Sequence, residues 1–390
     1  MLTVSSEQTS PPVLTEAHRI RDVDQAAWDG LARGASVYSS HAWLSYTEQY
    51  GDCEPRYLLI HARGRLVAAL PTFTFAAEVP RYYDPAFLFP PGEGDPAGTT
   101  RPLLLGGTRQ GYTSELLMAP GLPADLAETS ARMLIEALRE RPGVGMRALL
   151  YLTDAALRHV LPVTTDDDAV VLLDARARLT IDPDGLAGFR RRVSDNTAAR
   201  MRKEMRNFRD AGCQVEVSRV SECHQHLGRL SAQVLQRYGH PNTAEEESER
   251  FARQAEQLDD LGVVLLARHE GSIVGFTQFF VWGDVMYGRV HGVDDRIARQ
   301  AALYYNLTYY HAIEYAAEHG LTLLDLGCDS YEAKVRRAAR LEPLWGVVLG
   351  ANWSAQLRDR FHQQQRKRLD EFAEWDPTIR DELVRELVDR

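Results

Sequence analysis

Apolar and polar positions alternate most regularly between residues 263 and 334, and the elements predicted there organise the rest of the chain. Three apolar runs rich in β-branched residues are separated by the turn signals Glu270-Gly271-Ser272 and Gly283-Asp284; the runs are Val263 to His269, Ile273 to Val281 and Val285 to Val293. This pattern predicts three consecutive strands in an antiparallel meander.

The periodicity changes after the third strand. From Arg299 to His319, apolar side chains fall on nearly every face at helical spacing, which predicts a buried helix, and Gly320 follows at a C-cap position. Leu321 to Leu326 is a short strand that leads into the polar segment Gly327-Cys328-Asp329. A meander followed by a helix and a parallel-type strand resembles the core of the GNAT acyl-transfer fold.

The first half of the chain repeats part of this pattern. Arg56 to His61 and Leu66 to Phe75 flank the turn Arg63-Gly64-Arg65 and predict a second hairpin, which suggests two copies of one architecture. The segment 82–107 is rich in Pro, Gly and Asp and predicts a lid or a loop that lines a cleft. We expect an α+β fold of two tandem GNAT-like domains, each a mixed, mostly antiparallel twisted sheet flanked by helices. The predicted divisions are a flexible tail at 1–15, an N-terminal domain at 16–180, a C-terminal domain at 181–355 and a helical tail at 356–390.

A basic helix is predicted from Leu186 to Asp210. Its apolar stripe consists of Phe189, Val193, Met201, Met205 and Phe208, and the other faces carry eight Arg and Lys residues. One interpretation is a solvated face that forms salt bridges with the acidic stretch Glu245 to Glu249. The other is a wall that faces phosphate groups.

Composition narrows the function classes. A length of 390 residues suggests two or three domains at about 150 residues each. The formal net charge of −10 argues against a general nucleic-acid coat protein, and no DNA partner is expected. The cysteines are scattered without metal-ligand spacing, so no metal is expected. The polar N-terminus is neither a signal peptide nor an anchor, and no apolar run reaches membrane-span length, so we expect a cytoplasmic protein.

One six-residue segment indicates how the donor of the acyl group is bound. GNAT enzymes bind the donor pyrophosphate where a helix begins after a strand, with a signature of Arg or Gln, two residues, Gly, one residue, and Gly or Ala. Here the register gives Arg296-Ile297-Ala298-Arg299-Gln300-Ala301, in which Arg299 replaces the central Gly. A side chain there crowds the backbone approach to phosphate, or offers a guanidinium in its place.

The chain resembles the Fem-type and FemAB-like GNAT transferases, both in this departure from the signature and in several longer segments. The similar segments are the basic helix from Leu186 to Arg209, Ser36 to Trp43, His319-Gly320-Leu321, Asp325-Leu326-Gly327 and Tyr331-Glu332-Ala333-Lys334. The resemblance implies two GNAT-like domains and transfer of an aminoacyl group from aminoacyl-tRNA to an amine, without a bound cofactor. Stand-alone relatives form amide bonds in natural-product pathways, and others act on peptidoglycan.

Three functions follow from these observations. The first is a transferase that uses aminoacyl-tRNA as donor and a small-molecule amine as acceptor. The second is an N-acyltransferase of the same fold that uses acetyl-CoA or another acyl-CoA, against which Arg299 is evidence. The third is a double-GNAT module that binds without catalysis. The sequence does not fix the oligomeric state.

Candidate catalytic residues lie on the third strand and the long helix. Tyr287, Arg289 and His291 alternate and therefore share one face, where His291 is a candidate base and Arg289 a candidate ligand of carboxylate or phosphate. The alternative is that they pack or pair structurally. Tyr304 and Tyr305 are candidate general acids, with core packing as the alternative.

The remaining candidates come from neighbouring strands and the polar loop. Gln278 is a candidate for substrate binding or a satisfied core amide. Asp325 is a candidate catalytic residue that binds the acceptor amine, or a cap of the following loop. Asp329 and Lys334 are expected to contact substrate. The residues assigned to donor phosphate or tRNA are Arg296, Arg299, Arg202, Lys203, Arg206 and Arg337.

Overall fold

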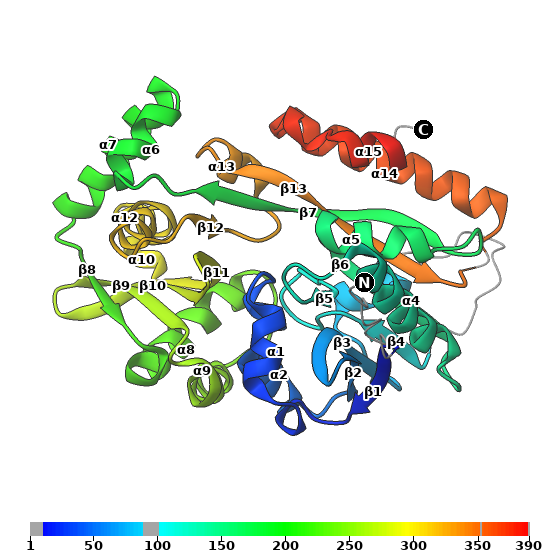
Figure 1. Ribbon diagram of the computed structural model, residues 1–390. Helices are drawn as coiled ribbons and strands as arrows, with labels where there is room; N and C mark the ends of the chain where they lie inside the picture. Colours follow the sequence, from blue (N-terminus) through cyan, green and yellow to red (C-terminus); the bar gives the residue numbers. More distant parts are fainter. Residues whose placement is uncertain (1–10, 89–100, 352, 389–390) are drawn as a thin grey trace, which may run out of the picture. The chain divides into compact units, whose positions relative to one another are not determined.

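The fold comes from a computed structural model of the chain, which describes residues 11–88, 101–351 and 353–388 (Figure 1). The chain divides into two compact units. Unit 1 comprises the described residues up to Asp174, Pro343–Leu369 and the residues from Glu382 onward; unit 2 comprises Ala175–Glu342 and Asp370–Asp381. The fold class is α+β, with mixed, mostly antiparallel strands and flanking helices, as predicted. Within the described ranges, no helix is both long and apolar enough to cross a bilayer.

Unit 1 is built on the strand order β1-β2-β3-β4-β6-β13. β4 and β6 run parallel, whereas β1–β2, β2–β3, β3–β4 and β6–β13 are antiparallel. Its elements are β1 (Val13–Ala17), α1 (Gln25–Ala32), α2 (His41–Glu48), β2 (Glu54–Ala62), β3 (Arg65–Phe75), α3 (Pro85–Leu88), β4 (Leu103–Gly106), β5 (Leu117–Met118), α4 (Ala124–Glu140), β6 (Met146–Leu152), α5 (Asp154–Val160), β7 (Ala169–Thr180), β13 (Arg340–Leu349), α14 (Ala355–Trp375) and α15 (Glu382–Leu387). Three of these elements, β7, β13 and α14, lie partly in unit 2.

Unit 2 contains the strand order β7-β12-β11-β10-β9-β8, in which β11 and β12 run parallel and the other neighbours are antiparallel. Its elements are α6 (Gly185–Arg192), α7 (Asp195–Asp210), β8 (Gln214–Ser218), α8 (Val220–Arg237), α9 (Ala244–Leu258), β9 (Gly262–His269), β10 (Ser272–Trp282), β11 (Val285–Val293), α10 (Asp295–Ala298), α11 (Leu303–Tyr305), a π-helical turn (Asn306–Tyr310), α12 (His311–Glu318), β12 (Leu323–Asp325) and α13 (Tyr331–Val335).

Both predicted hairpins are present, and the same turn chemistry closes them. Arg63 and Gly64 have φ of 52° and 72°, and Glu270 and Gly271 have φ of 48° and 78°. Two consecutive residues with positive φ form the type of tight turn whose twist matches that of paired strands, and glycine adopts the second position without strain. The local sequence therefore determines these hairpins.

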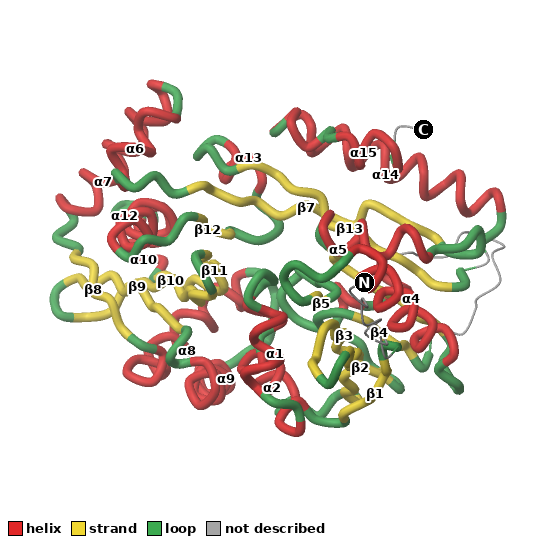
Figure 2. Tube along the Cα trace, viewed as in Figure 1, coloured by secondary structure: helices red, strands yellow, loops and turns green. Residues whose placement is uncertain are grey.

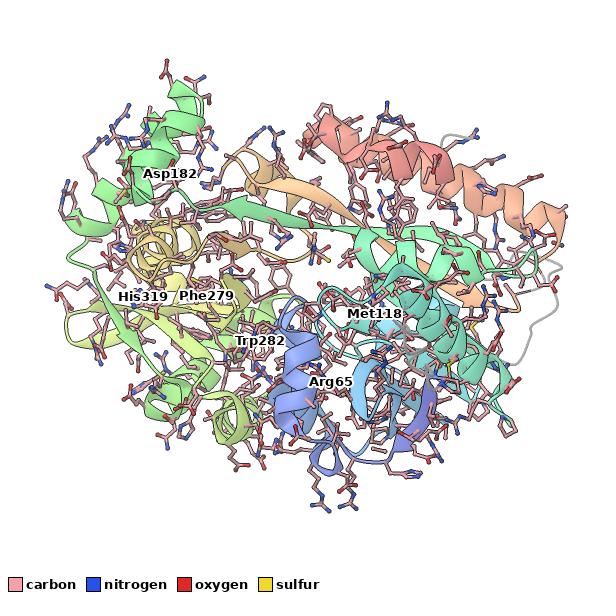
Figure 3. The ribbon with its side chains drawn as sticks, in the orientation of Figure 1. Arg65, Met118, Asp182, Phe279, Trp282 and His319 are labelled. Atoms are coloured by element: carbon pink, nitrogen blue, oxygen red, sulfur yellow. The ribbon has the colours of Figure 1, made fainter. Side chains whose placement is uncertain are left out.

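Helices cover both faces of the unit 2 strands. In Figures 1 and 2, α8 and α9 lie on one side of β8–β11, and α12 lies on the other. The α8 side is closed by a buried apolar cluster that includes Leu227, Leu230, Phe251 and Phe276. Phe279, labelled on β10 in Figure 3, is fully buried. Burial on both faces fixes the register of β10 and β11, and therefore the direction in which their polar side chains point.

Several boundaries differ from the predicted ones. Residues 1–10 of the predicted tail lie outside the described residues, but Val13–Ala17 form β1, which pairs with β2. The first unit boundary falls at Asp174, near the predicted residue 180, whereas residues 343–369 and 382–390 return to unit 1. Part of the predicted lid, 89–100, also lies outside the described residues. The long helix begins at Leu303 rather than Arg299, because Ala302 takes a left-handed conformation with φ of 50°.

We predict that Gly292→Ala destabilises unit 2 by about 3 kcal/mol, because overpacking of a filled site carries that order of cost. A Cβ at Gly292 on β11 lies 2.8 Å from the backbone carbon of Leu230 on α8 and 2.4 Å from Phe276 Cε1. Gly288→Ala on the same strand is the control, since its Cβ meets no atom closer than 3.4 Å. Urea denaturation followed by fluorescence measures both, and equal midpoints for the two variants would contradict the prediction.

Candidate active site

The site begins where two parallel strands separate. β11 pairs with β12 only through Val285↔Leu323, Met286↔Leu324 and Tyr287↔Asp325. β11 continues to Val293 while still paired with β10, so among the described residues its other edge is unpaired from Gly288 onward. Ligands of open α/β sheets bind beyond the carboxyl ends of parallel strands, at such a parting.

The free edge of β11 is the first wall of the site, and the loop that follows β12 forms the second. The Asp325 carboxylate accepts a hydrogen bond from the Gly327 amide at 2.9 Å and lies 3.7 Å from Arg176 and 3.8 Å from Arg178. The chain after β12 then remains beside β7, since Ala177 exchanges hydrogen bonds with the segment at Leu326 and Gly327. These contacts hold β12 away from β11.

Lys334 closes the polar loop that follows. Its side chain is 4% exposed, and Nζ donates to the carbonyl oxygens of Gly327 at 3.0 Å and Cys328 at 2.6 Å. Asp329 and Ser330 in this loop have φ of 65° and 51°. The buried ammonium thus fixes a loop of left-handed residues as one wall of the site.

The third wall is the broken helix after β11. Asn306, fully buried in the π-helical turn, places its side-chain nitrogen 3.0 to 3.3 Å from the carbonyl oxygens of Ala302, Ala301 and Glu204. A π-turn inside a helix often marks a functional site. Here it joins the bend at Ala302 to α7, so that Arg299, Tyr304 and Tyr305 face one cleft.

Two adjoining cavities occupy the space between these walls. The larger, about 970 Å³, is lined by α7, the end of α8, the 298–305 segment and α13. The smaller, about 180 Å³, is lined by Thr277, Arg289, Cys328 and Lys334, among others. Three residues line both cavities: His291, Tyr304 and Ser330. A group held in one cavity therefore meets a group held in the other at His291.

The larger cavity has an excess of positive charge. Arg200 and Lys203 on α7 and Arg299 line it, and within the described residues none of the three has a carboxylate within 4.0 Å. Arg237 also lines it and pairs with Asp295. Glu204 is the acidic lining residue, and it is already engaged by Arg337. Unpaired cations around a concave surface attract a polyanionic ligand.

A buried network supports this wall. Arg337, 3% exposed, donates from Nη2 to Glu204 at 3.1 to 3.2 Å, and the Tyr310 hydroxyl donates to the same carboxylate. The Arg337 guanidinium lies 3.8 Å from the Tyr305 ring centroid. The network ties α7, the π-turn and the segment after α13 together, which fixes the position of the α7 cations relative to Tyr305.

His291 is neutral at physiological pH. Burial is the main cause that lowers its pKa from 6.5 to about 4, and the positive charge of Arg237 adds to the effect. Its ring centroid lies 4.8 Å from that of Tyr304. Burial also raises the pKa of Tyr304, so the phenol keeps its proton. The junction of the cavities therefore holds a neutral imidazole, able to accept a proton, beside a phenol able to donate one.

The junction expected to bind a donor pyrophosphate is occupied by the protein itself. The Asp294 carboxylate caps α10 by accepting from the Arg296 amide at 3.0 Å, and it also forms an ion pair with the Arg296 side chain at 2.6 Å. The hydrogen bond from Arg296 lowers the pKa of Asp294. α10 has four residues, and a carboxylate at its start repels a second anion.

The predicted site residues divide into three groups. The structure brings together around the two cavities His291, Tyr305, Arg289, Lys334, Arg299 and Lys203. Arg337 lines a separate small cavity. The residues that line none of these three cavities are Tyr287, Gln278, Asp325, Asp329, Arg296, Arg202 and Arg206.

Physical reasons account for five of the seven residues in the third group. Gln278 is fully buried and donates to Gln254 Oε1 at 2.8 Å, so it lies in the core instead of contacting substrate. Asp325 caps its loop and pairs with arginines. Arg296 is bound to Asp294, and Arg202 and Arg206 are exposed on other faces of α7.

Sequence reasoning missed residues whose roles depend on distant partners. Arg200 was included in the basic helix but not assigned to the site, and Glu204, Arg237 and Asn306 were not singled out. The spacing of Arg200 and Lys203, three apart, was the available signal, because such residues share a helix face.

Comparisons with known proteins agree with this geometry. Residues 195–335 match the family model described as "Acetyltransferase (GNAT) domain". Comparison with curated proteins gives no match. Among solved structures, the chain is similar to FemX at 10% identity and a TM-score of 0.58, over 90% of this chain and 99% of that chain. It is also similar to L-PGS from Bacillus licheniformis at 11% identity and a TM-score of 0.51, over 88% of this chain and 96% of that chain.

At these identities, the structural likeness shows the fold. Among the described residues, no group of three or more His, Cys, Asp or Glu side chains is arranged to hold a metal ion. The matched domain contains both cavities, from Arg200 on α7 to Lys334 on α13. Residues 195–335 thus form a domain of the GNAT acyltransferase type.

Proposed function

We propose that the protein forms an amide bond by moving an aminoacyl group from aminoacyl-tRNA to a small-molecule amine. The observation that carries the proposal is a group of three cations, Arg200, Lys203 and Arg299, around a wide cleft that ends at the neutral His291. None of the three has a carboxylate partner in the described part of the chain. The cations suit the phosphates of an RNA 3′ end, and His291 suits the amine.

The chemistry needs little covalent assistance from the protein. The amine nitrogen attacks the ester carbonyl, the new C–N bond forms, and the C–O bond to the donor breaks. His291 accepts the proton released by the amine. Tyr304, which lies beside His291, gives a proton to the departing oxygen. Alignment of the two substrates supplies much of the rate acceleration.

The occupied helix start supports a donor other than coenzyme A. A diphosphate placed at α10 meets the Asp294 carboxylate, whereas the free cations lie on α7 and at Arg299. The Fem-type resemblance of the sequence and the structural similarity to FemX support the same choice. On this proposal the acceptor belongs to a natural-product or peptidoglycan-related pathway.

The alternative is an acyl-CoA-dependent N-acyltransferase of the same fold. It is favoured by the description of the matched family as an acetyltransferase domain. The two functions differ only in the donor, so one assay separates them.

In that assay, purified protein is mixed with an amine panel and either charged tRNA or acetyl-CoA, and amide products are identified by mass spectrometry. We expect amide product in the mixtures that contain charged tRNA and none in those that contain acetyl-CoA. The His291→Ala variant should give no product. Turnover with acetyl-CoA and none with charged tRNA would replace the proposal with its alternative.

We predict that Lys203→Gln and Arg299→Gln each weaken donor use and lower the salt dependence of KM by about 0.7 in logarithmic slope, the value for one single-strand phosphate contact. The donor is a short aminoacylated RNA that carries only the 3′-terminal nucleotides, so contacts outside the cleft do not contribute. Arg202→Gln and Arg206→Gln each remove one positive charge from α7, as Lys203→Gln does, but should retain the wild-type slope. Equal slopes for all four variants would argue against the cleft as the donor site.

We predict that the His291 imidazole stays neutral from pH 8 to about 5 and titrates near pH 4, which heteronuclear NMR measures with His291→Asn as the assignment control. The unfolded chain titrates near 6.5, so the unfolded state binds the extra proton between these values. Stability is accordingly lost as pH falls from about 6.5 to 4. Arg237→Gln should raise the midpoint, and a wild-type midpoint near 6.5 would refute the assignment of a neutral base.

A further inference from the structure

A third cavity, of about 220 Å³, lies at the N-terminus of α7. It is lined by Ser194, Asn196, Thr197, Arg200, Tyr310, Arg336 and Arg337. Three of these seven residues are arginines, and among the lining residues there is no acid. A small polar cavity with this composition suits an anion with several acceptor oxygens.

The three arginines differ in whether a nearby carboxylate already neutralises their charge. Arg200 has no carboxylate within 4.0 Å in the described structure, whereas Arg336 pairs with Glu332 across one helical turn. Arg337 is 3% exposed and pairs with Glu204, but its Nε has no hydrogen-bond partner among the residues that the structure describes. A buried guanidinium donor without an acceptor is costly, and an oxyanion bound in the cavity that Arg337 lines removes that cost.

The helix contributes backbone donors to the same place. Ser194 Oγ accepts from the Thr197 amide at 3.3 Å, and the amides of Asp195 and Asn196 have no acceptor among the described residues. Thr197 Oγ1 donates to the Arg336 carbonyl at 3.2 Å, which joins the helix start to the arginine segment. A helix of sixteen residues adds partial positive charge at this end.

The cavity and the donor cleft share one lining residue. Arg200 lines both the 220 Å³ cavity and the 970 Å³ cleft. It stands one turn after Asn196 and three residues before Lys203 on α7, so these side chains follow one helix face from the cavity into the cleft. Arg200 therefore places the cavity next to the cleft in which we propose that the donor binds.

We propose that this cavity is a second phosphate subsite, which binds a backbone phosphodiester of the RNA donor upstream of the phosphates held in the main cleft. The proposal rests on the proposed function for the identity of the donor, whereas phosphate binding itself rests on the cavity. In this arrangement α7 is the element that follows the RNA backbone, and the subsite sets donor affinity without touching the reacting atoms.

Two variants test the subsite without threatening the fold. Arg336→Ala removes a side chain that is 57% exposed. Asn196→Asp keeps the shape of the side chain and places a negative charge in the cavity, and an acid in the first turn of a helix stabilises the helix. Arg209→Ala, exposed in the last turn of α7, is the control for loss of one positive charge.

The first measurement is binding of inorganic pyrophosphate to the full chain by calorimetry. We expect Arg336→Ala and Asn196→Asp to weaken binding about 5- to 10-fold, the effect of losing one charged hydrogen bond at a partly exposed site. Arg209→Ala should bind pyrophosphate as tightly as the wild type. Unchanged binding in both test variants, with thermal unfolding at the wild-type temperature, would overturn the subsite.

The second measurement separates this inference from the proposed function. With the aminoacylated short RNA, both test variants should raise KM about 5- to 10-fold and leave kcat unchanged, because the subsite holds only the donor. If pyrophosphate binding depends on Arg336 but RNA gives no turnover, the subsite stands and the donor assignment fails. If RNA turns over with a KM insensitive to Arg336→Ala and Asn196→Asp, the subsite fails and the donor assignment stands.

Discussion

The site depends on one constraint, the parting of β11 from β12 after three paired residues. Parallel neighbours normally continue to pair, because unpaired backbone groups are costly. Here Asp325, between Arg176 and Arg178, keeps the end of β12 beside β7, and Lys334 closes the following loop on its own carbonyl groups. The charged residues at this point act as spacers. They hold open a gap into which His291 on β11 projects.

The charges around the cleft suit both attraction of an anion and proton transfer in the proposed reaction. Arg200, Lys203 and Arg299 have no acidic partner among the described residues, so their field extends into the cleft. The positive charge of Arg237 and burial keep the pKa of His291 low, so the imidazole does not become another cation. Glu204 is the acidic group in the wall, and Arg337 and Tyr310 occupy its oxygens. The cleft therefore attracts anions while it retains a neutral base.

Local patterns accounted for much of the fold. The strands at 263–293 and the turns between them follow from β-branched runs and X-Gly pairs, because these signals act within a few residues. His291, Arg289 and Tyr305 were found for a similar reason: alternation along a strand and clustering on a helix are visible in the sequence. The basic character of α7 was equally visible, because charge is a property of composition.

What lies opposite each residue was decided by tertiary structure. Arg200 and Lys203 face the cleft, whereas Arg202, with the same charge and on the same helix, does not; the sequence gives the angle between them but not the wall that α7 meets. Arg337 is buried against a carboxylate 133 residues away, which no local pattern specifies. Gln278 lies in the core because helices cover both faces of its sheet. The sequence determined which chemical groups the protein has and their local geometry, and long-range packing determined which of them meet at the site.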